Sequence, residues 1–262
     1  MNTIDLTNLQ MLAIFGIFLI PLILIAVLRL GILRDTIYSA LRMTAQLFLI
    51  GLYLKYIFDL NSLLLNAVWM IAVILVADYS ILKQAGLKRN IFFTRIFFGT
   101  LFASASITLI FVMAIIQPDP LYDARYLIPI FGMTLGNCMR GNVISLERFY
   151  GGLRKNEREH ITSMLSGATL YESITPFLRN ALLTALNPMI ATMATMGIVS
   201  LPGMMTGQIL GGSLPLTAIK YQIAIMICIF SVMIVGSFIN IIITLPVGFN
   251  PYGMLRKDIF TR

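Results

Sequence analysis

The sequence predicts an all-α fold: a polytopic bundle of about seven transmembrane helices in a single domain, residues 1–262. Hydrophobic residues make up 58% of the chain and charged residues only 11%, whereas a soluble domain carries about 25% charged residues. The polar residues are therefore too few to cover the apolar surface in water. The apolar residues also gather in seven runs, each near the roughly 20 residues that a helix needs to cross a bilayer. Membrane barrel strands are about ten residues long and alternate in polarity, so the run lengths indicate helices.

The predicted spans are spread along the whole chain. They are Leu6–Leu28, Thr36–Leu54, Leu63–Leu82, Ile96–Ile116, Tyr126–Leu146, Ala181–Val199 and Gln222–Leu245. The first is a long charge-free run with no basic residue before it, unlike a signal peptide, which has a basic start and a shorter apolar core. Proline and glycine clusters, such as 117–120 and 201–203, separate the later runs.

The basic residues predict the direction of each span. Fourteen lysines and arginines fall in the tail and in the loops after the first, third and fifth spans. Only three, Lys55, Arg125 and Lys220, fall in the other loops. Because cytoplasmic loops carry the excess of basic residues, the N-terminus is predicted to lie outside and the C-terminus inside.

Several protein classes are excluded by the residues that are missing. No G-x-x-x-x-G-K-[ST] motif is present, so the chain itself is not expected to be an ATPase. The single histidine, His160, lies in a predicted cytoplasmic loop, which argues against an intramembrane Ser/His protease. The last span has no lysine for a retinal Schiff base. The net charge of +8 comes from loop residues and does not indicate nucleic acid, and Cys138 and Cys228 lie in apolar runs and indicate no disulfide framework.

One long cytoplasmic segment, residues 147–180, is predicted to hold two short helices around a glycine. Apolar residues recur at helical spacing between Ile161 and Ala168, and Gly167 interrupts the pattern. The second helix is expected to end before Pro176. The first helix is amphipathic, which is typical of a linker on the membrane surface or of a docking element for a cytoplasmic partner.

Polar residues in the fifth span lie on one helical face. Met133, Asn137 and Arg140 stand at positions i, i+4 and i+7. Asn137 is expected to make an interhelical hydrogen bond or to line a pathway, and Arg140 is close enough to the cytoplasmic end for its guanidinium to reach the surface. Gly132 and Gly136 form a G-x-x-x-G motif on a neighbouring face, which predicts close helix packing.

Other polar residues lie in the second and third spans. Arg42 and Gln46 are one turn apart in the second span, and Asp78 lies near the cytoplasmic end of the third. Asp78 is therefore expected to pair with Arg42 or Arg140. The middle of each predicted span contains no Asp or Glu.

The segment Ser200–Pro215 is unusually apolar for a loop and contains four glycines and two prolines. Irregular backbone at membrane depth is tolerated where it lines a cavity. We therefore predict a re-entrant or gate-like turn, with a tight apolar connection as the alternative. Met193, Met196, Met204 and Met205 gather nearby. Thioethers bind soft metal ions and bind iron weakly, but methionine is also a common filler of apolar packing, so no metal ligands are assigned.

Three motifs, in this order, resemble the FetB family of ABC-transporter permeases: GMTLGNCM, SGATLYESITPFLR and SLPGMMTGQILGG. That family is associated with iron export in bacteria, and its relatives include plant aluminium-tolerance permeases. The resemblance covers nearly the whole chain and implies a multi-pass permease of the bacterial cell membrane, a homodimer, with a separate ATP-binding subunit and no cofactor. The residues that resemble the segment docking on the ATPase are Ser166, Gly167, Ala168, Thr169, Leu170 and Tyr171. Ile161 stands where the family pattern has an acidic residue.

The predicted function is thus an ATP-driven permease that exports iron or another metal species. Motion of the ATPase subunits would reach the helices through the Gly167 region. The predicted route is lined by Met133, Asn137, Met204, Thr206 and Gln208. The alternative is a secondary transporter or a channel. Secondary transporters usually show internal repeats and mid-membrane carboxylates, and the sequence indicates neither.

Overall fold

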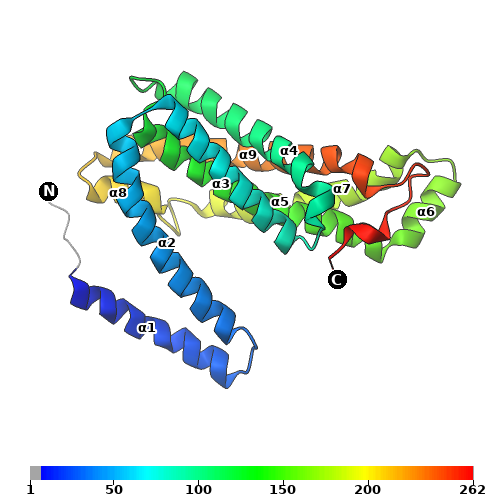
Figure 1. Ribbon diagram of the computed structural model, residues 1–262, viewed down its shortest axis with the longest axis horizontal. Helices are drawn as coiled ribbons and strands as arrows, with labels where there is room; N and C mark the ends of the chain where they lie inside the picture. Colours follow the sequence, from blue (N-terminus) through cyan, green and yellow to red (C-terminus); the bar gives the residue numbers. More distant parts are fainter. Residues whose placement is uncertain (1–6, 262) are drawn as a thin grey trace.

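The computed structural model describes residues 7–261, and within that range the chain is all-α (Figure 1). Isolated bridges are the only strand-like contacts among those residues. The helices are α1 (Asn8–Val27), α2 (Leu33–Leu60), α3 (Leu63–Gln84), α4 (Arg89–Ile110), α5 (Ala124–Lys155), α6 (Glu157–Leu165), α7 (Leu170–Thr195), α8 (Gly203–Leu210) and α9 (Pro215–Gly248). A π-helix, Phe111–Ile116, continues α4, and a 3-10 turn, Lys257–Ile259, lies in the tail. Leu6 and Arg262, which were assigned to the first span and the basic tail, lie outside the described residues.

Five segments are long and apolar enough to cross a membrane, judged by length and composition. They are α1, α2, α3, α4 with its π-helical end, and α9. The predicted fifth and sixth spans lie in α5 and α7, whose apolar runs are interrupted by polar residues such as Asn137, Arg140 and Asn180. A multi-pass helical membrane protein is therefore confirmed, whereas seven crossings and the orientation of the termini stay predictions.

The body of the protein consists of α3, α4, α5, α7 and α9, and α5 packs extensively on both α9 and α7. One core cluster lies toward α8 and a second lies toward α6 and the tail. α1 and α2 project away from this body (Figure 1). None of the described α1 side chains is buried, and in α2 only Ile57 is. α1 contains no charged residue, and a helix that is apolar all round and not covered by protein is stable in lipid rather than in water, which fits a membrane environment.

Close helix contacts occur at glycines other than those of the G-x-x-x-G motif. A Cβ atom at Gly236 of α9 would lie 2.6 Å from Sγ of Cys138 on α5. At Gly136 such an atom would have no neighbour within 4 Å, and at Gly132 only the Trp69 ring, at 4.0 Å. The predicted close packing at Gly132 and Gly136 is therefore wrong within this chain. The motif indicates a helix face without large side chains, but it does not indicate whether a neighbouring helix packs on that face.

The short helix before Gly167 is present as predicted, whereas the helix after Gly167 is much longer than predicted. α6 is the expected short helix, and Gly167 has φ of +96°, a conformation that favours glycine. The second helix does not end before Pro176; α7 runs for 26 residues to Thr195. Proline inside a helix removes a backbone hydrogen bond, but Ala181 and Ala185, further along α7, are buried against the bundle and stabilise the continuing helix. α5 also continues to Lys155, so residues 147–155 are helix rather than loop.

Ser200–Pro215 is mostly a short helix rather than an irregular turn. α8 occupies 203–210 and packs on α9. Gly197, with φ of +85°, and Gly212, with φ of +96°, form the turns on either side. The predicted re-entrant turn is wrong in its local structure, because a helix satisfies its own backbone hydrogen bonds in an apolar setting whereas an irregular loop does not.

Candidate functional site

A cavity of about 510 Å³ lies between α5, α7 and α9. α5 contributes Asn137 and Arg140, which are three residues apart and therefore share a face. The side-chain amide of Asn137 donates a hydrogen bond to the carbonyl oxygen of Met133, at 2.9 Å. α7 contributes Pro188 and Thr192. The cavity thus combines one cation and a few polar groups with an otherwise apolar wall.

A second cavity, of about 550 Å³, lies between α7, α8 and α9 and shares Met196, Pro202 and Met226 with the first. Gln222 lines it, and its Nε2 lies 3.9 Å from Sδ of Met196. The methionines that line the two cavities are Met189, Met193, Met196, Met205, Met226 and Met233. Their thioethers are soft, polarizable and adaptable. No group of three or more His, Cys, Asp or Glu side chains that could hold a metal ion exists among residues 7–261.

The structure brings together only part of the predicted route. Asn137 lines the first cavity, while Met133 and Met204 pack beside the core cluster near α8. Thr206 and Gln208 lie on α8 and line neither cavity. The Thr206 hydroxyl donates to the carbonyl oxygen of Pro202 at 3.0 Å, and the side-chain oxygen of Gln208 is buried without a hydrogen-bond partner.

Three cavity methionines, Met189, Met226 and Met233, were not singled out from the sequence, whereas Met193 and Met196 were. Met226 and Met233 of α9 stand seven residues apart, and Met189 and Met193 of α7 stand at i and i+4. Both spacings place the side chains on one helical face. This signal was available in the sequence, but only the packing of α7 against α9 shows that the two faces line adjoining cavities.

Asp78 is fully buried in the bundle, and the predicted ion pair with Arg42 or Arg140 is wrong. Its carboxylate lies close to Thr100 and to the thiol of Cys138, both near the middle of their helices. Among the residues that the structure describes, no ion pair involves Asp78. The reason is helical geometry: Asp78 faces α4 and α5, whereas Arg42 lies against the opposite side of α3. Asp78 is therefore buried inside the bundle, six residues before the end of α3.

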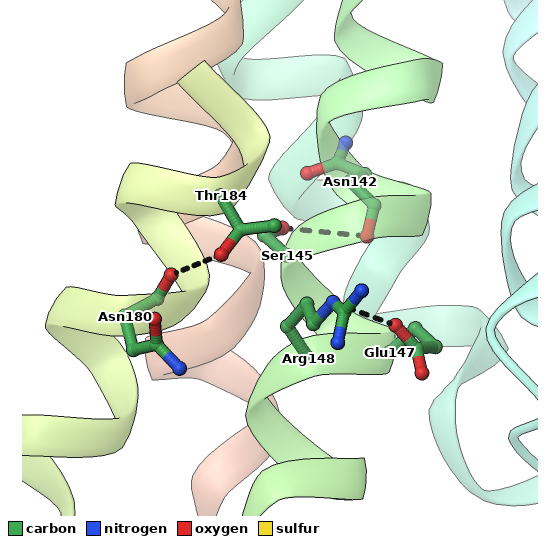
Figure 2. Close-up of polar contacts among 6 residues, drawn as sticks. All are labelled: Asn142, Ser145, Glu147, Arg148, Asn180 and Thr184. Atoms are coloured by element: carbon green, nitrogen blue, oxygen red, sulfur yellow. Dashed lines mark hydrogen bonds and ion pairs between the residues drawn. The ribbon is translucent and has the colours of Figure 1, made fainter. Parts of the chain in front are cut away.

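The contact between α5 and α7 has polar groups that bond within their own helices (Figure 2). The Ser145 hydroxyl donates to the carbonyl oxygen of Asn142 at 3.3 Å, and the Thr184 hydroxyl donates to that of Asn180 at 2.8 Å. Arg148 forms an exposed ion pair with its neighbour in α5, Glu147, at 3.5 Å. None of the interactions drawn between these six residues crosses from α5 to α7. A shift of α7 against α5 would therefore break none of them.

The start of α7 is fixed by a capping box. Thr169 is the N-cap residue, and its backbone N–H and hydroxyl donate to the Glu172 carboxylate at 2.7 and 2.8 Å. These hydrogen bonds lower the pKa of Glu172. Since the pKa in the folded state lies below its ordinary value, the contact stabilises the helix start at neutral pH and is lost only as acid protonates the carboxylate. The turn at Gly167 therefore leads into a well-defined helix.

Two large apolar side chains are exposed on either side of the Gly167 turn. Leu165, the last residue of α6, is 83% exposed, and Tyr171, in the first turn of α7, is 64% exposed. Both residues lie at the end of the molecule whose loops contain most of the basic residues. An apolar pair in this position is suited to binding a partner protein.

The C-terminal tail holds α6 in place, a contact that was not predicted because the tail was considered only for its charge. His160 of α6 is buried, its Nε2 lies 2.8 Å from the carbonyl oxygen of Gly253, and its ring lies 5.7 Å from that of Phe249. The tail in turn contacts the α3–α4 loop, where the backbone N–H of Lys88 donates to Ile259 at 2.8 Å. The tail thus joins α6 to α3 and α4.

Replacing His160 with alanine is expected to loosen α6 from the tail. The change removes a buried ring and a hydrogen bond, which together contribute about 2–3 kcal/mol. Amide hydrogen exchange in residues 157–165 and 250–260 should therefore speed up roughly 30- to 100-fold. His160→Phe keeps the ring and removes only the hydrogen bond, so it should have a smaller effect. Unchanged exchange in the alanine variant would show that His160 does not hold the two segments together.

Taken together, apolar helices, an unpacked helical hairpin and cavities between the helices of the bundle define a multi-pass helical membrane protein. The chain belongs to the family described as "Uncharacterised protein family (UPF0014)", whose profile matches residues 8–247. This confirms the resemblance noted from the three motifs.

Named relatives cover most of the chain. A UPF0014 membrane protein of Synechocystis, slr1647, is 32% identical over 83% of each chain. Protein ALUMINUM SENSITIVE 3 of Arabidopsis thaliana is 30% identical over 87% of this chain and 82% of its own length. The "Probable iron export permease protein FetB" of Escherichia coli is 27% identical over 95% of each chain. No solved structure matches the chain.

Proposed function

We propose that this protein is the permease subunit of an ABC transporter of the bacterial inner membrane, exporting iron or another metal species with ATP hydrolysed by a separate subunit. Two copies would form the pathway, each crossing the membrane seven times with its C-terminus inside. The observation that carries the proposal is the exposed apolar pair, Leu165 and Tyr171, at the Gly167 turn. An apolar surface at the end of a bundle that has no P-loop of its own fits the groove of an ATP-binding partner.

The packing of α6 supports a role in transmitting motion. α6 contacts α5 and α7 directly, and through His160 and the tail it is tied to the α3–α4 loop. A push on Leu165 would therefore act on several helices of the bundle at once. Because the polar groups of α5 and α7 in Figure 2 bond within their own helices, these two helices can shift without breaking those bonds.

The cargo is inferred from the relatives and from the cavity walls. The name of the Escherichia coli relative refers to iron export, and that of the Arabidopsis thaliana relative to aluminium sensitivity. The two adjoining cavities present thioethers together with Asn137 and Gln222. This lining suits transient contact with a metal species better than tight binding, since the described residues that form it include the cation Arg140 and no carboxylate, thiolate or imidazole ligand.

The proposal is tested by purifying the protein in mild detergent together with a candidate ATP-binding protein and measuring ATP hydrolysis with and without Fe²⁺. A stable complex, with hydrolysis that depends on this chain and rises with Fe²⁺, supports the permease and its cargo. Hydrolysis that depends on this chain but does not respond to Fe²⁺ supports the permease and rejects iron. A correctly folded protein that binds no candidate ATPase contradicts the proposal.

A secondary transporter is the second candidate, and one observation favours it. Asp78 is a buried carboxyl group in the last third of α3, and neither of its oxygens has a hydrogen-bond partner among the described residues. Carboxylates in this position couple ion movement to transport in secondary transporters. Substrate transport by the protein alone in proteoliposomes, driven by an ion gradient and abolished by Asp78→Asn, would favour this second function.

A further inference from the structure

A basic pocket of about 460 Å³ lies between α2 and α3, on the side of α3 that faces away from the bundle. Arg42 enters it from α2 and Lys83 from the last turn of α3, and no acidic side chain of residues 7–261 lines it. Neither cation takes part in an ion pair among residues 7–261. The guanidinium of Arg89 lies beside the pocket, 4.4 Å from the centre of the Tyr79 ring, and adds to the positive charge. The pocket is therefore suited to an anion.

The other half of the pocket is apolar. Leu75 and Val76 of α3 line it and are 39% and 60% exposed. Tyr38, one helical turn before Arg42 on α2, is also exposed. In an apolar span these side chains face lipid, so a ligand here must be compatible with hydrocarbon at one end and with two cations at the other. A soluble anion would be compatible with the two cations but not with the hydrocarbon end of the pocket.

We propose that the pocket binds an anionic phospholipid, with the phosphate between Arg42 and Lys83 and an acyl chain along Leu75 and Val76. Arginine binds phosphate through two parallel N–H donors, and lysine adds a point charge. Basic pockets between transmembrane helices on the cytoplasmic side bind such headgroups. The predicted orientation places this pocket toward the cytoplasmic leaflet.

The lipid would also affect the position of α2. In the described residues α2 touches the bundle mainly near Ile57, which packs with Ala124 and Ile128 at the other end of the helix. The end that carries Arg42 has no core contacts. A phospholipid bridging Arg42 and Lys83 would tie that end to α3 and so fix the angle at which the α1–α2 hairpin leaves the body. This inference is independent of ATP coupling.

The test compares lipid binding by the purified full chain in native mass spectrometry, with phosphatidylglycerol and phosphatidylcholine as probes. We expect at least a tenfold preference for phosphatidylglycerol, which Arg42→Gln/Lys83→Gln should abolish. The control, Lys55→Gln/Arg125→Gln, removes the same two charges at the opposite end and should keep the preference. Both pairs lie at exposed positions, and elution as a single species checks that each variant is folded.

A second measurement separates a lipid from a free anion. Hydrogen exchange in residues 33–45 should slow when phosphatidylglycerol is added and should not change with millimolar inorganic phosphate. Equal protection by inorganic phosphate would overturn the lipid assignment. So would equal binding of both lipids by the wild type, or an equal loss of preference in the control variant, since either result would mean a nonspecific interaction.

Discussion

Replacing Gly236 with leucine is expected to remove folded protein from the membrane. A Cβ atom at this position of α9 would already lie 2.6 Å from Sγ of Cys138 and 3.5 Å from Cβ of Ala103. Leucine would add three more carbon atoms at a point where α9 meets α5 and α4. Because both neighbours are fully buried, they have no free space to occupy. Overpacking of this kind costs about 3 kcal/mol or more, which is a large part of the stability of a small domain.

The measurement is the yield of monodisperse protein after mild detergent extraction, together with its thermal unfolding midpoint. Gly136→Leu is the matched control, because it introduces the same side chain into α5 where a Cβ atom has no neighbour within 4 Å. The control should retain the wild-type yield and midpoint. If Gly236→Leu behaves like the control, the close approach of α9 and α5 described here is incorrect.

If the proposed function is correct, replacing Leu165 with aspartate is expected to reduce chain-dependent ATP hydrolysis at least tenfold in the proposed complex with an ATP-binding protein. Leu165 is 83% exposed, so the change breaks little within the chain itself. In the complex it would place a charge where an apolar side chain is buried. Truncating a central apolar side chain of an interface typically weakens the binding free energy by about 2 kcal/mol. An unpaired charge in the same place weakens it further. A loss of about 1.4 kcal/mol already corresponds to tenfold weaker binding.

The control for this variant is Leu121→Asp. Leu121 is 49% exposed in the connection before α5, and Leu165 follows the other end of that helix. The control variant should bind the partner and support hydrolysis as the wild type does. Full activity in Leu165→Asp, at normal abundance, would mean that the partner does not dock on α6.

Helix positions were predictable from the sequence because an apolar run of about 20 residues has few alternatives in lipid. Each of the seven predicted runs overlaps a long helix, although Ala181–Val199 extends beyond the end of α7 at Thr195. The helix around Pro176 was not predictable in the same way. Whether a proline ends a helix depends on the packing further along, here the burial of Ala181 and Ala185. The local sequence indicates that the proline destabilises a helix, but it does not reveal the tertiary contacts that offset this loss of stability.

The candidate site was predictable only where a single helix determines the geometry. Asn137 and Arg140 share a face of α5 by their spacing alone, and both line the first cavity. The contribution of Met226 and Met233 depends on how α9 packs on α7, and the burial of Asp78 depends on which side of α3 faces α4. Such relations between helices are set by tertiary packing, which a single sequence does not state.

The hydrogen bond between His160 and Gly253 also determines when the surface around α6, proposed above as a docking site, becomes complete. The two residues are 93 positions apart, and α6 is made first. At 5–20 residues per second, roughly 5 to 20 s pass before the ribosome adds the tail. Until then α6 has its direct contacts with α5 and α7 but lacks the tail that joins it to the α3–α4 loop. A chain cut short before Phe249 would keep most of its helices but would lack the tail contact to α6, so we expect only finished chains to present the proposed docking surface in its final form.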